Sequence, residues 1–169
     1  MKNHRPCPSC GVERAGQRSL IEDLAFEYRI PLINLIDASG GSVASIRKGG
    51  HGVFPGLHGF ERSVQLLGIM PVVSVVLGVA AGGPAGRAVL SHFSTMVRRT
   101  SQLFAAGPPI VARAMKKELT REKLGGSEIA VNAAGTIDNV ADSEAEAIAI
   151  ALRFLRFMPQ NVWEAPLAH

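Results

Sequence analysis

Apolar positions along this chain fall into short groups separated by glycine and proline. Brief, mostly apolar runs predict strands buried on both faces, which need no alternation of apolar and polar residues. Apolar residues three or four positions apart predict helices with one apolar side. The pattern predicts strands over 32–36, 72–77, 94–97 and 102–104. It predicts helices over 19–28, 60–70 and 85–90, and a last helix that ends near 157. Two short helical segments are predicted over 108–115 and 119–123.

Side-chain patterns and capping signals support the predicted helices. One side of the first helix carries the apolar residues Leu20, Leu24 and Phe26. Pro84 suits the first turn of the third helix, where its missing N–H leaves no hydrogen bond unmade. Ser143 and Glu146 form a capping box, which predicts the start of the last helix.

Two diglycine loops carry the clearest chemical signal. Gly40-Gly41 follows the first predicted strand, and Gly82-Gly83 follows the second. Helix, strand and glycine loop in repeated order predict parallel βαβ units, whose ligands bind beyond the carboxyl ends of the strands. Glycine lets a ligand approach main-chain N–H groups without a Cβ in the way, and such groups stabilise an oxyanion. Either loop alone is better explained as an ordinary turn, whereas the pair fits a turn and an oxyanion site equally well.

Side chains for acid–base chemistry are few. The acids and histidines expected in or near loops are Asp37, His51, His58, Glu61 and His92. Asp37 at a strand end suits a loop cap, and His92 suits a structural, hydrogen-bonded role. The sequence contains no nucleophile elbow, dinucleotide fingerprint or phosphate-binding P-loop. These patterns argue against nucleophilic and dinucleotide-dependent catalysis.

Composition and charge exclude several classes of protein. The formal net charge is +4, and its basic residues are scattered without interleaved aromatics, which argues against nucleic-acid binding. The start of the chain lacks the apolar core of a signal peptide. Proline and glycine interrupt the apolar run 64–81, which argues against a membrane span. We therefore expect a cytoplasmic α/β protein with no membrane partner.

The two cysteines, Cys7 and Cys10, form half of a zinc site. A second C-x-x-C pair is absent from the sequence, so a reduced thiol pair in a frayed terminus is the favoured interpretation. We expect no metal.

An ordered series of segments points to a known family. The segments are Ile-Asp-Ala-Ser-Gly-Gly (36–41), the strand and diglycine loop 72–85, Leu-Phe-Ala-Ala-Gly-Pro-Pro-Ile-Val (103–111), Leu-Gly-Gly-Ser (124–127), Val-Ala-Asp-Ser-Glu-Ala-Glu-Ala (140–147) and 152–161. In order and spacing they resemble the N-terminal half of the carboxyltransferase β subunit of biotin-dependent acyl-CoA carboxylases. The resemblance runs from about Ser19 to Pro166.

This resemblance implies a crotonase-like α/β fold, in which ββα turns form a spiral. It implies transfer of a carboxyl group from carboxybiotin, carried by a biotin carboxylase or biotin carrier subunit, to the α-carbon of an acyl-CoA. It also implies a homo-oligomer. Backbone amides of the diglycine loops would hold the enolate, with Gly40, Gly41, Gly82 and Gly83 as catalytic residues. The implied substrate-binding residues are Ser39, Ala85, Gly107, Pro108 and Pro109.

The resemblance also divides the chain. Residues 1–18 are expected to be an irregular N-terminal segment, 19–158 a partial carboxyltransferase half-domain, and 159–169 a tail toward a C-terminal half that this sequence lacks. The family carries strands and a helix before its first matching helix, so we expect a fold truncated at the N-terminus. Activity would then require companion subunits.

Two other functions stay open on the sequence. The chain could be a non-catalytic CoA-binding or assembly fragment. It could also be an acyl-CoA hydratase or decarboxylase of crotonase type, for which Glu61 is the candidate carboxylate. The choice among acyl-CoA substrates is open as well.

Overall fold

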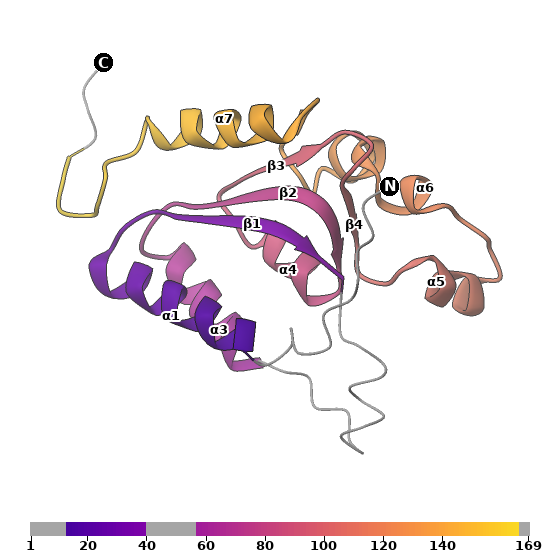
Figure 1. Cartoon of the computed structure of the whole chain (residues 1–169), viewed down its shortest axis with the longest axis horizontal. Coiled ribbons are helices and arrows are strands. Elements are labelled where there is room, and N and C mark those ends of the chain that lie inside the picture. The colour runs from indigo at the N-terminus through magenta and orange to yellow at the C-terminus, as the bar shows by residue number, and fades with distance from the viewer. Residues whose placement is uncertain (1–12, 40–56, 166–169) are drawn as a thin grey trace.

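Parallel strands form the centre of the molecule (Figure 1). The computed structural model describes residues 13–39 and 57–165, with side chains from 20–39 and 60–165. Its sheet has the order β1-β2-β3-β5, and β4 pairs with the far end of β2. The strands are β1 (Leu32–Ala38), β2 (Val72–Ala81), β3 (Phe93–Val97), β4 (Gln102–Phe104) and β5 (Asn139–Ala141). Every pairing is parallel, which confirms the predicted βαβ organisation.

β2 is the central strand because its side chains are apolar on both faces. Its first five residues, 72–76, are all buried. The first part of β2 pairs with β1 on one side and β3 on the other, and its last three residues pair with β4. An apolar strand without alternation is what burial on both faces requires.

Helices cover the two faces of the sheet unequally (Figure 1). One face packs against α1 (Glu13–Tyr28), α3 (Leu57–Leu67) and α4 (Gly83–Val89), through clusters that include Leu66, Ala85 and Ala88. The other face packs against α7 (Glu144–Leu155), through a cluster that includes Ala147 and Ala151. Small alanines at these contacts bring the helices close to the sheet.

The predicted boundaries of the elements differ from the observed ones at several ends. β4 and the helix α5 (Pro108–Met115) match the prediction. α1 starts at Glu13 rather than Ser19, α3 runs over 57–67 rather than 60–70, and α7 ends at Leu155. β1 and β2 are longer than predicted, and β2 continues until the diglycine bend.

Two elements between β4 and α7 were not predicted. After the short α6 (Arg121–Gly125), a π-helix η1 (Glu128–Ala133) and the strand β5 complete the crossover from β4. Gly125 is needed there because a Cβ at this position would lie 2.0 Å from the carbonyl oxygen of Leu103. β5 has three residues, too few to give a recognisable apolar pattern.

α1 does not turn all the residues of its predicted apolar side toward the sheet. Leu20 is 59% exposed and Leu24 is 39% exposed, whereas Glu22 is 3% exposed and Ala25 is buried. The reason is an ion pair beneath the helix, because the inward Glu22 carboxylate meets Arg87 of α4. Leu20 and Leu24 therefore face outward, whereas Phe26 is partly buried against the core cluster that contains Leu66.

The cap of α7 confirms the predicted capping box with one change. The Ser143 hydroxyl oxygen accepts a hydrogen bond from the Glu146 N–H at 3.1 Å. The Glu146 carboxylate in turn accepts from the N–H of Asp142 at 2.7 Å, one residue before the usual donor.

The long apolar run of the sequence is divided between elements. It ends α3, turns at Gly68 and continues into β2. Among the described residues, no helix combines the length and apolar character needed to cross a bilayer.

Candidate functional site

Three parallel strands end at the same edge of the sheet, and the predicted site lies there (Figure 1). Ala38, the last residue of β1, stands opposite Ala80 of β2. The N–H of Gly82, directly after β2, donates to the carbonyl oxygen of Phe104 at the end of β4 at 3.1 Å. Ser39, Gly82 and the Gly107 turn therefore follow neighbouring strand ends. Gly40 and Gly41 lie outside the described residues.

Gly82 shapes the bend between β2 and α4. Its backbone has φ 67° and ψ −124°, a conformation that residues with a Cβ avoid. Its N–H is bonded to Phe104, and its carbonyl oxygen accepts from the N–H of Gly86 at 3.1 Å. Both main-chain polar groups of Gly82 are therefore used inside the protein. Gly82 can hold the geometry of the site, but its N–H is not available to a ligand.

Gly83 offers the main-chain donor that Gly82 lacks. It is the first residue of α4 and is exposed, and Pro84 follows it within the first turn, as the sequence predicted. Its N–H has no hydrogen-bond partner among the described residues. A Cβ built on Gly83 would meet no atom of the described residues within 4 Å. The Ala85 methyl is buried in the core, which leaves only the main chain of Ala85 for a substrate.

A bulge aligns the ends of β1 and β2. The register shifts between Ile36 and Ala38, so that β2 carries extra residues here. Gly78 lies at the bulge, and a Cβ on it would lie 2.2 Å from an Asp37 carboxylate oxygen. Asp37 can thus pack against the backbone of β2, consistent with a local structural role. Bulges of this kind bend a strand and redirect the residues that follow it.

The turn after β4 forms the other side of this edge. Gly107 precedes α5, and Pro108 and Pro109 occupy the first turn of that helix. The Gly107 carbonyl oxygen accepts from the N–H groups of Ile110 and Val111 at 3.0 and 3.2 Å. Gly107 has φ −70°, and a Cβ on it would make ordinary contacts of 3.7 Å or more. Its backbone therefore does not require glycine.

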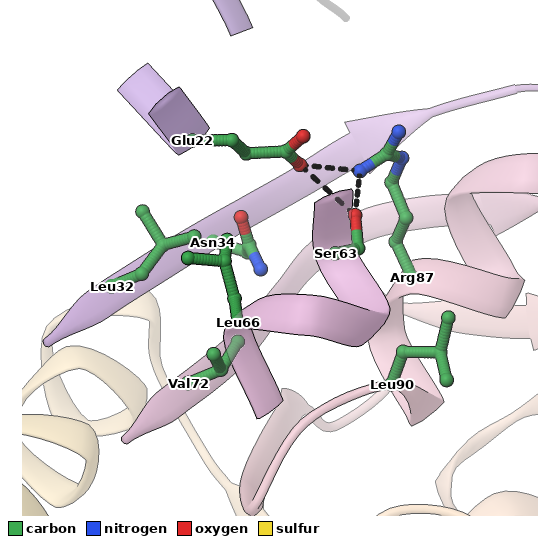
Figure 2. A pocket seen from close by; sticks show the side chains of 8 residues that line it. All are labelled: Glu22, Leu32, Asn34, Ser63, Leu66, Val72, Arg87 and Leu90. Carbon is green, nitrogen blue, oxygen red and sulfur yellow. Dashed lines mark hydrogen bonds and ion pairs between the residues drawn. The ribbon is translucent and has the colours of Figure 1, made fainter. Parts of the chain in front are cut away.

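A buried polar cluster, Glu22–Ser63–Arg87, lies beneath α4 and joins three helices (Figure 2). Arg87 of α4 donates to the Glu22 carboxylate of α1 at 2.5 Å and to the Ser63 hydroxyl of α3 at 2.7 Å. The adjoining cavity measures about 10 Å³, room for about one water molecule, so it is no substrate pocket. The sequence analysis missed this cluster, since Glu22 and Arg87 are 65 positions apart.

The candidate acid–base side chains have structural or exposed positions. His92 accepts from the N–H of Val72 through Nδ1 at 3.0 Å, and its Nε2 lies 3.0 Å from the carbonyl oxygen of Leu67. This is the structural role expected for His92. Glu61 is exposed on α3. The side chains of the other candidates, His51 and His58, and of Cys7 and Cys10 lie outside the described residues.

Arg98, directly after β3, is the clearest electrostatically perturbed group. Its hydrogen bond to Asp142, with the attraction of that carboxylate, raises the pKa of Arg98 above its ordinary value. The guanidinium thus stays charged and ties the end of β3 to the segment before α7. Within the described ranges, no group of three or more histidine, cysteine and acidic side chains could hold a metal ion.

Comparisons with known proteins find relatives that match most of this chain. The chain is 31% identical over 146 residues to the carboxyltransferase subunit of propionyl-CoA carboxylase from Haloferax mediterranei, covering 86% of this chain and 28% of that relative. It is 32% identical over 143 residues to the biotin-dependent acetyl-/propionyl-CoA carboxylase beta5 subunit of Mycobacterium tuberculosis, covering 83% and 25%. The chain thus spans about a quarter of the length of the curated relatives that it matches.

A solved structure shares the fold. The transcarboxylase 12S core, described as a hexamer assembly with methylmalonyl-CoA bound, superposes with a TM-score of 0.76 at 23% identity. The superposition covers 91% of this chain and 29% of that one, which confirms a crotonase-like fold for the part present here. The family model for the carboxyl transferase domain matches residues 9–169. The chain therefore belongs to the carboxyl transferase domain family.

Proposed function

We propose that this chain binds an acyl-CoA thioester and holds its carbonyl oxygen with the N–H of Gly83. The supporting observation is that, among the described residues, this N–H has no partner and no atom lies within 4 Å of a Cβ built on Gly83, at the carboxyl end of β2. Ligands of parallel sheets bind at this end. Membership of the carboxyl transferase domain family supplies the class of reaction.

In the proposed reaction, loss of the α-proton converts the thioester into an enolate whose oxygen carries negative charge. A main-chain donor fixed in place beforehand stabilises that oxygen more than it stabilises the neutral carbonyl. Gly82 contributes the bend that aims the donor, and the Gly107–Pro108–Pro109 turn would form the adjoining wall. Carboxybiotin, carried by a partner subunit, would supply the carboxyl group and the base. A second donor from Gly40 or Gly41 remains part of the proposal.

Binding without turnover is the second candidate function. It is favoured by the described acid–base candidates, since His92 is hydrogen-bonded within the fold and Glu61 is exposed. Both functions use the same thioester site and differ in whether a carboxylated product forms.

Affinity for propionyl-CoA tests the site that both functions share. Gly83→Ala places a methyl group beside the proposed donor without backbone strain and without a close contact to any described residue. We expect this variant to bind propionyl-CoA at least about tenfold more weakly, as loss of one hydrogen bond would give. Its melting temperature without ligand should match that of the wild type. Isothermal titration and thermal unfolding measure the two quantities.

Gly68→Ala is the matched control for this experiment. Gly68 lies after α3, and its added Cβ would make an ordinary 3.6 Å contact with the Gln65 carbonyl oxygen. We expect its affinity for propionyl-CoA to equal that of the wild type. Equal affinities of the wild type and Gly83→Ala would remove Gly83 from the site. A separate incubation with propionyl-CoA and carboxybiotin, followed by mass spectrometry of the CoA products, distinguishes turnover from binding alone.

A further inference from the structure

We propose that Arg87 and Glu22 are positioning residues that hold α4, and with it the Gly83 N–H, in the orientation that meets a thioester carbonyl. This inference rests on the proposed function of Gly83. It adds two side chains of the Glu22–Ser63–Arg87 cluster, neither of which touches the substrate. Figure 2 shows the Arg87 side chain directed from α4 toward Glu22 and Ser63.

Arg87 fastens α4 to its surroundings through both its side chain and its main chain. Its guanidinium donates to Glu22 of α1 and Ser63 of α3, and it lies 4.9 Å from the ring centroid of Phe60. Its carbonyl oxygen accepts from the hydroxyl of Ser74, a fully buried residue of β2, at 3.3 Å. One residue thus links α4 to two helices and the central strand.

α4 depends on such contacts because it is short. It has seven residues, and a helix of two turns does not hold a fixed conformation by itself in water. Its buried side chains are the methyl groups of Ala85 and Ala88. These small groups fix how far α4 lies from the sheet, but they restrict its rotation about its own axis less. A directional ion pair at Arg87 supplies the missing constraint. Gly83 lies four residues earlier on the same helix, about one turn away.

The burial of the pair makes its geometry demanding. The Glu22 side chain is 4% exposed and the Arg87 side chain is 14% exposed. Two charges this deep are stable only when paired and hydrogen-bonded, so neither can leave its place alone. Ser63 donates its hydroxyl to the same Glu22 oxygen at 3.2 Å, which further defines the position of the carboxylate. A buried pair of this kind favours one arrangement of the three helices over others.

A comparison of two ligands separates positioning from general loss of structure. Propionyl-CoA has the thioester carbonyl, and its thioether analogue, S-propyl-CoA, lacks it. We expect the wild type to prefer the thioester about tenfold, as one hydrogen bond would give. Arg87→Met and Glu22→Gln should reduce this preference to less than about threefold, because the donor is misaligned. Affinity for the thioether should stay within about twofold of the wild type.

The matched control is Arg62→Met. Arg62 of α3 pairs with Asp23 of α1 at 2.8 Å, so it is also an arginine–carboxylate pair between helices, but this pair does not involve α4. We expect Arg62→Met to keep the thioester preference. Arg87→Lys keeps the charge with a different hydrogen-bonding shape and should recover the preference only in part. Glu22→Gln serves as the informative variant if Arg87→Met does not fold.

An NMR measurement without ligand makes the outcomes distinct. The amide resonance of Gly83 should move in Arg87→Lys and Glu22→Gln and stay in place in Arg62→Met. An unmoved Gly83 resonance together with an unchanged thioester preference in both cluster variants would overturn the positioning role. A wild type with no thioester preference would instead overturn the proposed function, even where the cluster variants move the Gly83 resonance.

Discussion

Two helices of this protein begin in the same way and are held very differently. α4 and α5 each follow a strand that ends at the site edge, and each opens with glycine and proline. α4 buries Ala85 and Ala88 and is fastened through Arg87. α5 buries no residue, and its Ile110 and Met115 are each 63% exposed.

The difference shows what a glycine–proline start does and does not determine. Proline fixes φ in the first turn, and glycine permits the bend before it. α5 starts at the predicted Pro108, whereas α4 starts at Gly83, two residues before the predicted start. How firmly a helix is held depends on contacts with distant elements. α4 has these contacts and can hold a donor in one direction. α5 lacks comparable contacts among the described residues, so it is held less firmly.

The largest expected effect comes from breaking the anchor of α4. Arg87→Met leaves the Glu22 carboxylate buried without its partner, and we expect it to lower the free energy of unfolding by about 3–5 kcal/mol. Arg113→Met, in exposed α5, should change this free energy by less than about 0.5 kcal/mol. Urea unfolding measures both. Similar losses in the two variants would show that α4 and α5 are held alike.

A smaller effect is expected at the two glycine bends. Gly82→Ala places a Cβ on a backbone with φ 67°, and such strain costs about 1–3 kcal/mol. Gly107 has φ −70° and space for a methyl group, so Gly107→Ala should cost less than about 0.5 kcal/mol. The same unfolding experiment compares them. A Gly107→Ala loss as large as that of Gly82→Ala would contradict the assignment of strain to Gly82 alone.

The smallest change in stability is expected at the first-turn prolines, and it should be the same in α4 and α5. Pro84 and Pro108 each lie in the first turn of a helix and restrict the unfolded chain. Replacing either by alanine should therefore lower stability by about 0.4–1 kcal/mol through the unfolded state. Chemical denaturation of Pro84→Ala and Pro108→Ala tests this equality. A much larger loss for Pro84 would mean that its ring makes contacts that the main-chain argument omits.

The fold was predictable where local chemistry decides it. Mostly apolar runs located β1 and β2, and Pro108-Pro109 marked the start of α5. β5 escaped prediction because three residues give no recognisable apolar pattern, and the six-residue η1 was not predicted either. The first helix was predicted correctly as a helix, but the burial of Glu22 on its inward side was not predicted. In the sequence, a glutamate that pairs with a distant arginine looks like a surface residue.

The candidate site was predictable in position more than in detail. Repeated strand–glycine order predicted that the loops of Ser39 and Gly82 lie at one edge of the sheet, and the family resemblance added Gly107. The sequence could not show that the Gly82 N–H is used by Phe104 and that the Gly83 N–H has no partner among the described residues. Nor could it pair Glu22 with Arg87, because hydrophobic periodicity carries no information about contacts between distant polar residues.

The most direct test of the account follows the Gly83 amide proton by NMR during titration of the wild type with propionyl-CoA and with S-propyl-CoA. A hydrogen bond to the thioester carbonyl would move this proton downfield with propionyl-CoA and not with the thioether. A Gly83 proton that stays in place at saturating propionyl-CoA, while resonances elsewhere report binding, would contradict the central claim.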